Sequence, residues 1–116
     1  MGRPEHWHVD AGEAAVARLV VPADLHRERV FEVSCTMSVR VAPDAEGAWH
    51  RLTVLADGVR QWQRRVPSST AGGSDGLEYR FERRVPAGRP LALLAEADVA
   101  GVRRDKLVLT AEQVLD

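Results

Sequence analysis

The sequence of 116 residues lacks the features that mark several large classes of protein. It contains one cysteine, which excludes an internal disulfide. No apolar run approaches the roughly 18 to 20 residues that a membrane helix needs. Aromatic residues make up only 5% of the chain, and isoleucine and asparagine are absent. The net charge is only −1 at pH 7, which argues against a whole-molecule attraction to nucleic acid or to anionic lipid.

What the chain does contain is typical of a folded domain. Hydrophobic residues, mainly Val, Ala and Leu, account for 45% of the sequence, which is more than a disordered chain carries. A chain of this length buries roughly two thirds of the surface that its unfolded form exposes, so a core is feasible without a metal or a disulfide. We therefore expect a single domain over residues 1–116.

The first residues do not resemble a signal peptide. Met1 and Arg3 are followed by charged and imidazole side chains before any apolar run begins. The single Cys35 lies inside an apolar stretch, where a free thiol behaves as a small hydrophobe of a reducing compartment. From the sequence we expect a cytoplasmic protein.

The clearest pattern in the sequence spans Val30 to Val41. Apolar residues occupy every odd position from Phe31 onward, and polar residues fill the even positions between them. Successive side chains of a strand point to opposite faces, so this alternation predicts a half-buried strand. A helix would scatter the same residues around its circumference.

Seven further segments are expected to form strands. They are Trp7–Val9, Ala14–Val21, 48–57, 59–66, Leu77–Val85, Leu91–Ala97 and Leu107–Thr110. The second of them also fits a short helix, because it is rich in alanine. About eight short strands without a convincing amphipathic helix predict an all-β protein, an antiparallel β-sandwich of the jelly-roll type, with a barrel as the alternative.

Asp57-Gly58 is a strong hairpin signal, because both residues tolerate a positive φ. The hairpin Leu55-Ala-Asp-Gly-Val59 and the turn Pro86-Ala-Gly-Arg-Pro90 together resemble jelly-roll modules of the lectin and carbohydrate-binding type. This resemblance concerns the fold, and a fold alone does not fix a function.

A first chemical candidate is the segment His6-Trp7-His8-Val9-Asp10. On a strand His6, His8 and Asp10 share one face, and two imidazoles with a carboxylate suit a borderline divalent metal such as zinc. His26 or His50 is a candidate for the further ligand. The alternative is that these side chains form the solvated face of an edge strand.

A second candidate is Trp62 with Gln61, Gln63 and Arg64. The apolar face of an indole stacks on sugar rings, while Gln and Arg supply directional hydrogen bonds to hydroxyls. The same residue types also suit single-stranded nucleic acid. The alternative is a core tryptophan, which a chain with so few large side chains favours.

The face on which Trp62 lies depends on the strand register. A two-residue turn at Asp57-Gly58 pairs Trp62 with Thr53, whereas a longer loop with a glycine bulge is expected to pair it with Leu52. A slip of this kind moves the side chain to the opposite face of the sheet.

Fifteen arginines stand against one lysine in the sequence. Arg80 and Arg84 alternate with Glu78 and Glu82, which is typical of a solvated, ion-paired sheet face. Because of this pairing and the weak net charge, nucleic acid is not the expected partner.

Catalytic motifs such as a nucleophile elbow or a phosphate-binding loop are absent from the sequence. The leading hypothesis is therefore a small non-enzymatic binding module with a carbohydrate or protein partner, engaged by Trp62 and its neighbours. A second hypothesis is an assembly protein that forms homo- or hetero-oligomers through a sheet edge or through the Ser- and Thr-rich even face of residues 30–40. A metal-dependent activity of the His6-to-Asp10 segment is the third.

Overall fold

The computed structural model describes residues 3–115 as eight strands joined by short turns and loops. The strands are β1 (His6–Asp10), β2 (Val16–Val21), β3 (Arg29–Val41), β4 (Trp49–Ala56), β5 (Val59–Pro67), β6 (Ser74–Val85), β7 (Leu91–Ala100) and β8 (Val102–Gln113). The described residues contain no helix that is long and apolar enough to cross a membrane.

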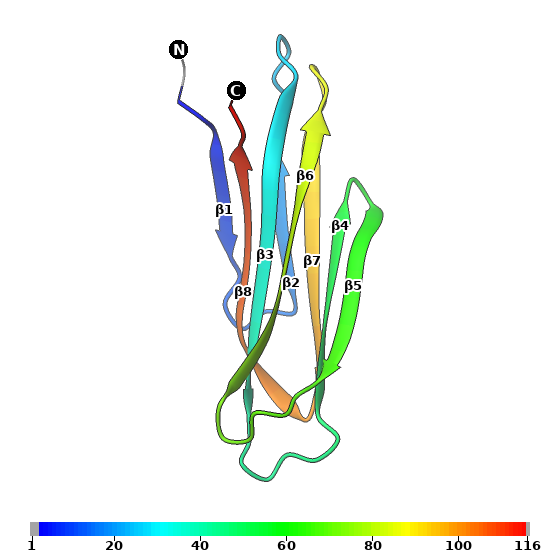
Figure 1. The fold of residues 1–116 in the computed structure, drawn as a ribbon. Coiled ribbons are helices and arrows are strands. Elements are labelled where there is room, and N and C mark those ends of the chain that lie inside the picture. Colours follow the sequence, from blue (N-terminus) through cyan, green and yellow to red (C-terminus); the bar gives the residue numbers. More distant parts are fainter. Residues whose placement is uncertain (1–2, 116) are drawn as a thin grey trace.

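The strands form two antiparallel four-stranded sheets that pack face to face (Figure 1). Sheet A has the order β1-β8-β3-β6, and sheet B has the order β2-β7-β4-β5. The chain crosses between the sheets at every connection except the β4–β5 hairpin and thereby winds two Greek keys into a jelly roll. The predicted antiparallel β-sandwich of the jelly-roll type is therefore confirmed.

The segment Ala14–Val21, for which a short helix was the alternative, is a strand. In β2 every second side chain is buried, and Ala17, Leu19 and Val21 face the core. The helix alternative is wrong because β2 pairs with β7 along one edge and packs its inner face against sheet A. Tertiary pairing overrides the helix propensity of alanine here.

The strand at the C-terminal end is longer than its apolar pattern indicates. β8 begins at Val102 rather than at Leu107, because it pairs with β3 through a register shift at Ser38/Val39. A bulge of this kind accommodates one extra residue and bends the strand. Charged residues such as Lys106 therefore belong to the strand, on its exposed side.

The core lies between the two sheets and consists mainly of Val, Ala and Leu side chains. Among the Phe, Tyr and Trp residues of positions 3–115, Phe31 is the only one that is fully buried. Cys35 is 1% exposed, and burial raises the pKa of its thiol to about 12. The thiol is thus held in its neutral form, as expected of a core cysteine.

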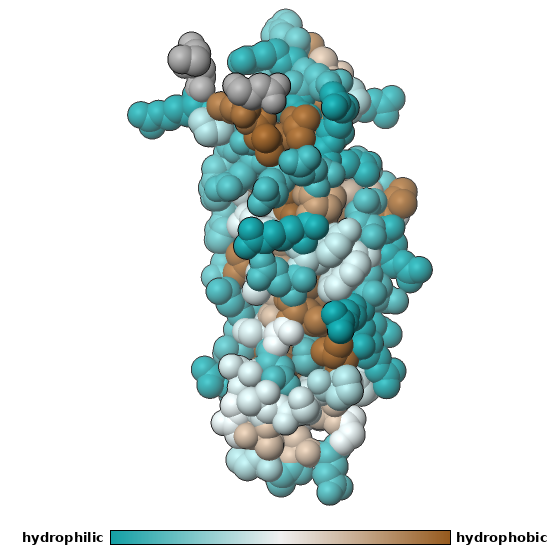
Figure 2. Space-filling model, in the orientation of Figure 1, coloured by the Kyte–Doolittle hydropathy of each residue, from teal (hydrophilic) through white to brown (hydrophobic). Residues whose placement is uncertain are grey.

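The two outer faces of the sandwich differ in character. Figure 2 shows that the face in view, where β3 and β6 lie in front in Figure 1, is largely hydrophilic, with a hydrophobic group near its upper end. The even-numbered residues of β3, from Glu32 to Arg40, lie on this outer face of sheet A. Ser34 there hydrogen-bonds Thr110 of β8.

Candidate ligand-binding surface on the β4–β5 hairpin

The predicted hairpin turns at Asp57-Gly58, and both residues have a positive φ, of 50° and 79°. These values fit a two-residue turn whose twist matches that of the strands. Asp57 also joins the hairpin to β7, because its backbone N–H donates to the carbonyl of Ala92 at 2.7 Å. Its carboxylate accepts the N–H of Ala92 at 3.0 Å, so the turn is fixed from both sides.

Trp62 pairs with Val54, so neither predicted partner, Thr53 or Leu52, is right. The two-residue turn pairs Ala56 with Val59, but the register then shifts between Val54 and Leu55. The extra residue at this bulge moves Trp62 to the inner face, which is the face that pairing with Leu52 would also have given.

Trp62 is half-buried in an aromatic ladder at the open edge of the sandwich. Its ring stacks on that of Tyr79 with centroids 4.7 Å apart and an interplanar angle of 3°. Tyr79 in turn stacks on Phe81 at 5.5 Å. Trp62 lies on β5 and the other two rings lie on β6, so the ladder bridges the edge strands of the two sheets. One face of the indole is therefore covered by protein.

The other residues of the predicted binding set do not gather around Trp62. Gln61 lies at the bulge and donates its side-chain N–H to the carbonyl of Val59 at 3.0 Å. Gln63 lies on the outer face, where it donates to the hydroxyl of Thr53 at 2.8 Å. Arg64 shares the side of Trp62 and is exposed to solvent. The predicted set is thus divided between two faces of one strand.

The tryptophan on the outer face of this hairpin is Trp49, which the sequence analysis did not single out. The guanidinium carbon of Arg65 lies over its ring, 4.4 Å from the centroid, and that of Arg51 lies 5.5 Å away. Cation–π contacts of this kind hold all three side chains in place. A hollow borders them, lined by Gly47, Ala48, Trp49, Arg65, Val66 and Pro67.

Arg51 and Arg65 are directly opposite each other on β4 and β5. Like charges in this position repel each other. Asp98 of β7 compensates Arg51, because its Oδ2 accepts from Nη2 at 2.9 Å and from Nε at 3.3 Å. Arg65 has no carboxylate within 4.0 Å in the part of the chain that the structure describes. The surface therefore holds one uncompensated positive charge beside an indole.

The alternation along β4 already places Trp49 and Arg51 on the same face of the strand. Trp49, Arg51, Thr53 and Leu55 alternate with His50, Leu52, Val54 and Ala56, and the second set is buried. Both sets contain apolar residues, so the alternation alone does not say which face points outward. The presence of β7 beside β4, which brings Asp98 to Arg51, is a long-range feature.

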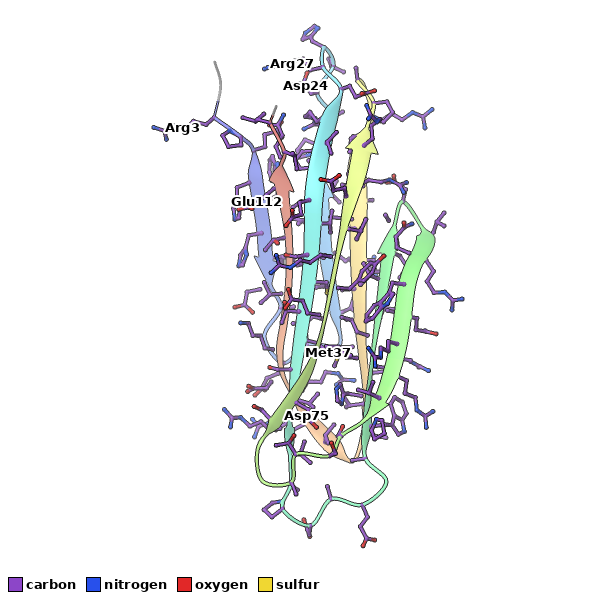
Figure 3. The ribbon with its side chains drawn as sticks, viewed as in Figure 1. Arg3, Asp24, Arg27, Met37, Asp75 and Glu112 are labelled. Atoms are coloured by element: carbon purple, nitrogen blue, oxygen red, sulfur yellow. The ribbon has the colours of Figure 1, made fainter. Side chains whose placement is uncertain are left out.

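His6, His8 and Asp10 share one exposed face of β1, as predicted, but they do not converge on a common point. Residues four apart on a strand are separated by roughly 13 Å, which is too far for one ion. His6 Nδ1 instead lies 3.0 Å from a carboxylate oxygen of Glu112, which Figure 3 places on β8 next to β1. Asp10 accepts the backbone N–H of Gly12 at 2.9 Å. Within residues 3–115 no group of three or more His, Cys, Asp or Glu side chains is arranged to hold a metal ion.

His50, one of the two histidines considered as a further ligand, is buried at the far end of β4. Its Nδ1 lies 2.7 Å from the hydroxyl of Ser68, and its Nε2 is buried without a hydrogen-bond partner in the described residues. The Ser68 hydroxyl contacts the ring, but Asp75 directs its carboxylate to Thr70 and to the backbone of Ser69. These residues therefore do not form a nucleophile–base–acid arrangement.

No protein-family model and no curated protein matches the sequence. Among solved structures, the chain is similar to dimeric latent PorU from Porphyromonas gingivalis, with a TM-score of 0.53 and 12% identity over 94% of this chain. The chain spans 11% of the length of that PorU chain. It is also similar to Eiger TNF from S. frugiperda, with a TM-score of 0.50 and 14% identity, over 97% of this chain and 94% of that one.

A third similar structure is an exo-β-1,3-galactanase from Phanerochaete chrysosporium, with a TM-score of 0.39 and 9% identity over 91% of this chain and 27% of that one. At these low identities the comparisons concern the fold, and they agree on a β-sandwich. What the molecule binds has to be argued from its own surface.

Proposed function

We propose that the protein is a small, non-enzymatic binding module that recognises an acidic carbohydrate on the outer face of its β4–β5 hairpin. The binding surface, called the Trp49 surface below, consists of Trp49, Arg51, Gln63 and Arg65. It keeps the hairpin and Gln63 of the sequence-based hypothesis but replaces Trp62 and Arg64 by the residues that share the outer face.

The observation that carries this proposal is the pair of opposed arginines, of which only Arg51 has a carboxylate beside it, that of Asp98, while Arg65 has none. An anionic group bound at Arg65 would relieve the repulsion that the pair now experiences. A guanidinium donates two parallel hydrogen bonds to a carboxylate or a sulfate, which favours a uronic acid or a sulfated sugar over a neutral one.

The neighbouring side chains suit the rest of a sugar. The indole of Trp49 offers an apolar surface to the C–H groups of a pyranose ring, in the hollow that it lines with Val66 and Pro67. The amide of Gln63 supplies a donor and an acceptor for hydroxyl groups.

The test is a glycan array that includes uronate-containing and sulfated sugars, followed by titration calorimetry with the best ligand. Arg65→Ala is expected to weaken binding about tenfold or more, since a charge-assisted hydrogen bond contributes about 1.5–3 kcal/mol. Trp49→Ala is expected to weaken it to a similar extent. Binding should also weaken as the salt concentration rises.

Arg64→Ala is the matched control, because it removes the same charge from the adjacent position on the other side of β5. It is expected to leave the affinity unchanged. Failure of the wild-type protein to bind any acidic glycan would contradict the proposal, and so would equal losses in Arg64→Ala and Arg65→Ala.

A further inference from the structure

The upper part of the outer face of sheet B carries an aliphatic patch. Its members are Val16, Val20, Leu55, Ala92 and Leu94, from three adjacent strands. Val16 is 40% exposed and Val20 is 58% exposed, while the two leucines are half-buried. In the registers of β2, β7 and β4, Leu94 and Leu55 lie side by side, with Val16 and Val20 one row away on either side. On β2 the patch is interrupted by Arg18, which lies between Val16 and Val20.

Two opposite charges lie beside this patch without partners. Arg18 of β2 is level with Leu94, and Glu96 of β7 is level with Val16, so they are diagonal neighbours on one face. Diagonal neighbours have Cα atoms roughly 7–8 Å apart. Neither side chain has an oppositely charged group within 4.0 Å among residues 3–115.

The outer face of sheet A is organised differently. There Arg80 pairs with Glu78 at 2.6 Å and with Glu32 at 3.7 Å, and Arg40 pairs with Asp105 at 3.3 Å. Charges on that face are thus largely compensated within the chain, as expected of a surface that faces water. The aliphatic patch of sheet B, with uncompensated charges at its side, is typical of a surface that packs against another protein.

We propose that the aliphatic patch binds a second copy of this chain, sheet B against sheet B. In this dimer the two-fold axis is perpendicular to the strands and parallel to the sheets. It passes between the row of residues that contains Arg18 and the row that contains Val16. Glu96 of one copy then lies over Leu94 of the other. Glu96 is then one strand spacing, roughly 4.8 Å sideways, from Arg18 of that copy. Symmetry makes this ion pair twice, because a two-fold interface uses the same residues from both subunits.

A second copy is the expected partner because the face of one copy carries the charges that complement those of the other. The face supplies both charges of the pair, so a copy of the same face meets each charge with its opposite, and the aliphatic side chains then surround the two pairs. Trp49 lies four residues from Thr53 along β4, farthest from the axis, whereas Gln63 pairs with Thr53 in the same row as Glu96 and therefore borders the interface.

The first test is light scattering of the full chain from micromolar to near-millimolar concentration. The wild type is expected to approach twice the monomer mass, and Leu94→Arg is expected to stay monomeric while keeping its β-sheet circular dichroism. Thr36→Arg is the control, because it places the same side chain on the outer face of sheet A, and it should dimerise like the wild type. A wild type that is monomeric at all concentrations would overturn the proposal, as would a dimer that Thr36→Arg rather than Leu94→Arg dissociates.

A charge-exchange experiment tests the proposed pair itself. Arg18→Glu and Glu96→Arg are each expected to raise the dimer dissociation constant at least tenfold, because each variant opposes like charges across the interface. An equimolar mixture of the two should recover a dimer, since the mixed dimer keeps one native pair and restores the other with its signs reversed. A mixture that remains as monomeric as its components would refute the arrangement, even if the wild type is a dimer.

Discussion

Trp49 and Trp62 show how far the surroundings of a residue set its role. Both lie on the β4–β5 hairpin and both have arginines nearby in the sequence. Trp62 is covered on one face by Tyr79 and joins the edges of the two sheets, whereas Trp49 is held on the outer face by Arg51 and Arg65. The first position is suited to stability and the second to recognition.

Trp62→Ala is therefore expected to destabilise the fold rather than to remove a ligand contact. Loss of a half-buried indole and of its stack on Tyr79 should lower the free energy of unfolding by about 2 kcal/mol, somewhat less than a fully buried tryptophan would cost. Urea unfolding followed by circular dichroism measures the change. Trp62→Phe retains an aromatic ring and should lose less than half as much. An unfolding free energy that Trp62→Ala leaves unchanged would show that the ladder contributes nothing.

The surroundings of Arg29 likewise determine how this buried charge is accommodated. Arg29 is 4% exposed, and its guanidinium donates to Glu5 at 2.7 Å and to the carbonyl of Pro22 at 2.7 Å. It also lies over the ring of Phe31, 5.2 Å from the centroid. A buried cation is tolerated here because both of its Nη atoms have an acceptor and one of these acceptors is a carboxylate. Its Nε is the exception, since it has no partner among residues 3–115.

At the scale of the elements, the β4–β5 hairpin determines which side chains reach which face. The turn at Asp57-Gly58 sets the start of the pairing, and the bulge between Val54 and Leu55 then shifts it by one residue. Every β5 side chain beyond the bulge therefore points to the face opposite to the one that a regular hairpin would give it. The composition of the Trp49 surface depends on this single irregularity.

The contribution of the turn to stability can be tested separately. Gly58 has a φ of 79°, so Gly58→Ala is expected to lower the free energy of unfolding by about 1 kcal/mol. Nothing lies within 4 Å of the added Cβ, so the cost would come from the backbone and not from a clash. Gly58→Asn is the control, because asparagine tolerates a positive φ, and it should cost clearly less. Thermal unfolding of both variants measures the difference, and equal losses would contradict the backbone explanation.

At the scale of the whole molecule, the long sandwich is held by carboxylates at both ends. Figure 3 places Asp24 near the upper end and Asp75 near the lower end. Asp75 accepts hydrogen bonds from the hydroxyl and N–H of Thr70 and from the N–H of Ser69, and these lower the pKa of its carboxyl. Asp24 accepts the N–H groups of His26 and Arg27, which lower its pKa in the same way. Both carboxylates thereby close loops next to β3, which runs the length of sheet A.

These shifts predict an acid-sensitive fold. A carboxyl whose pKa is lower in the folded state stabilises that state above its unfolded pKa of about 3.9, and the stabilisation is lost as the pH falls through the folded value. The free energy of unfolding, measured in urea at a series of pH values, should therefore fall below about pH 4. Asp75→Asn should be less stable at neutral pH and show a flatter acid slope. Asp44→Asn, in an exposed loop, is the control, and equal slopes in all three proteins would contradict this cause.

The two outer faces give the molecule its asymmetry. The face of sheet A is polar and internally compensated, while sheet B carries both the Trp49 surface and the aliphatic patch. We therefore propose sheet B as the side on which the molecule meets a partner.

The sequence by itself determined the fold class and most strand positions, because the alternation of β3 and the turn at Asp57-Gly58 are local patterns with a direct physical meaning. It also indicated a buried Cys35, since a small apolar side chain at an odd position of β3 has to face the core. The hairpin predicted to bind a ligand remains the candidate site.

The tertiary structure alone decided which residues of that hairpin face outward. The bulge that turns Trp62 inward follows from fitting β5 against β4, with Tyr79 of β6 across the open edge, and none of these contacts is local in the chain. The partner of Arg51 is Asp98 of β7, 47 positions away, and Leu94, which lies beside Leu55 of β4, also comes from β7. The local sequence determines which residues of a strand alternate. The packing of strands that are distant in sequence determines which side chains surround each face, and thereby the chemistry of that face.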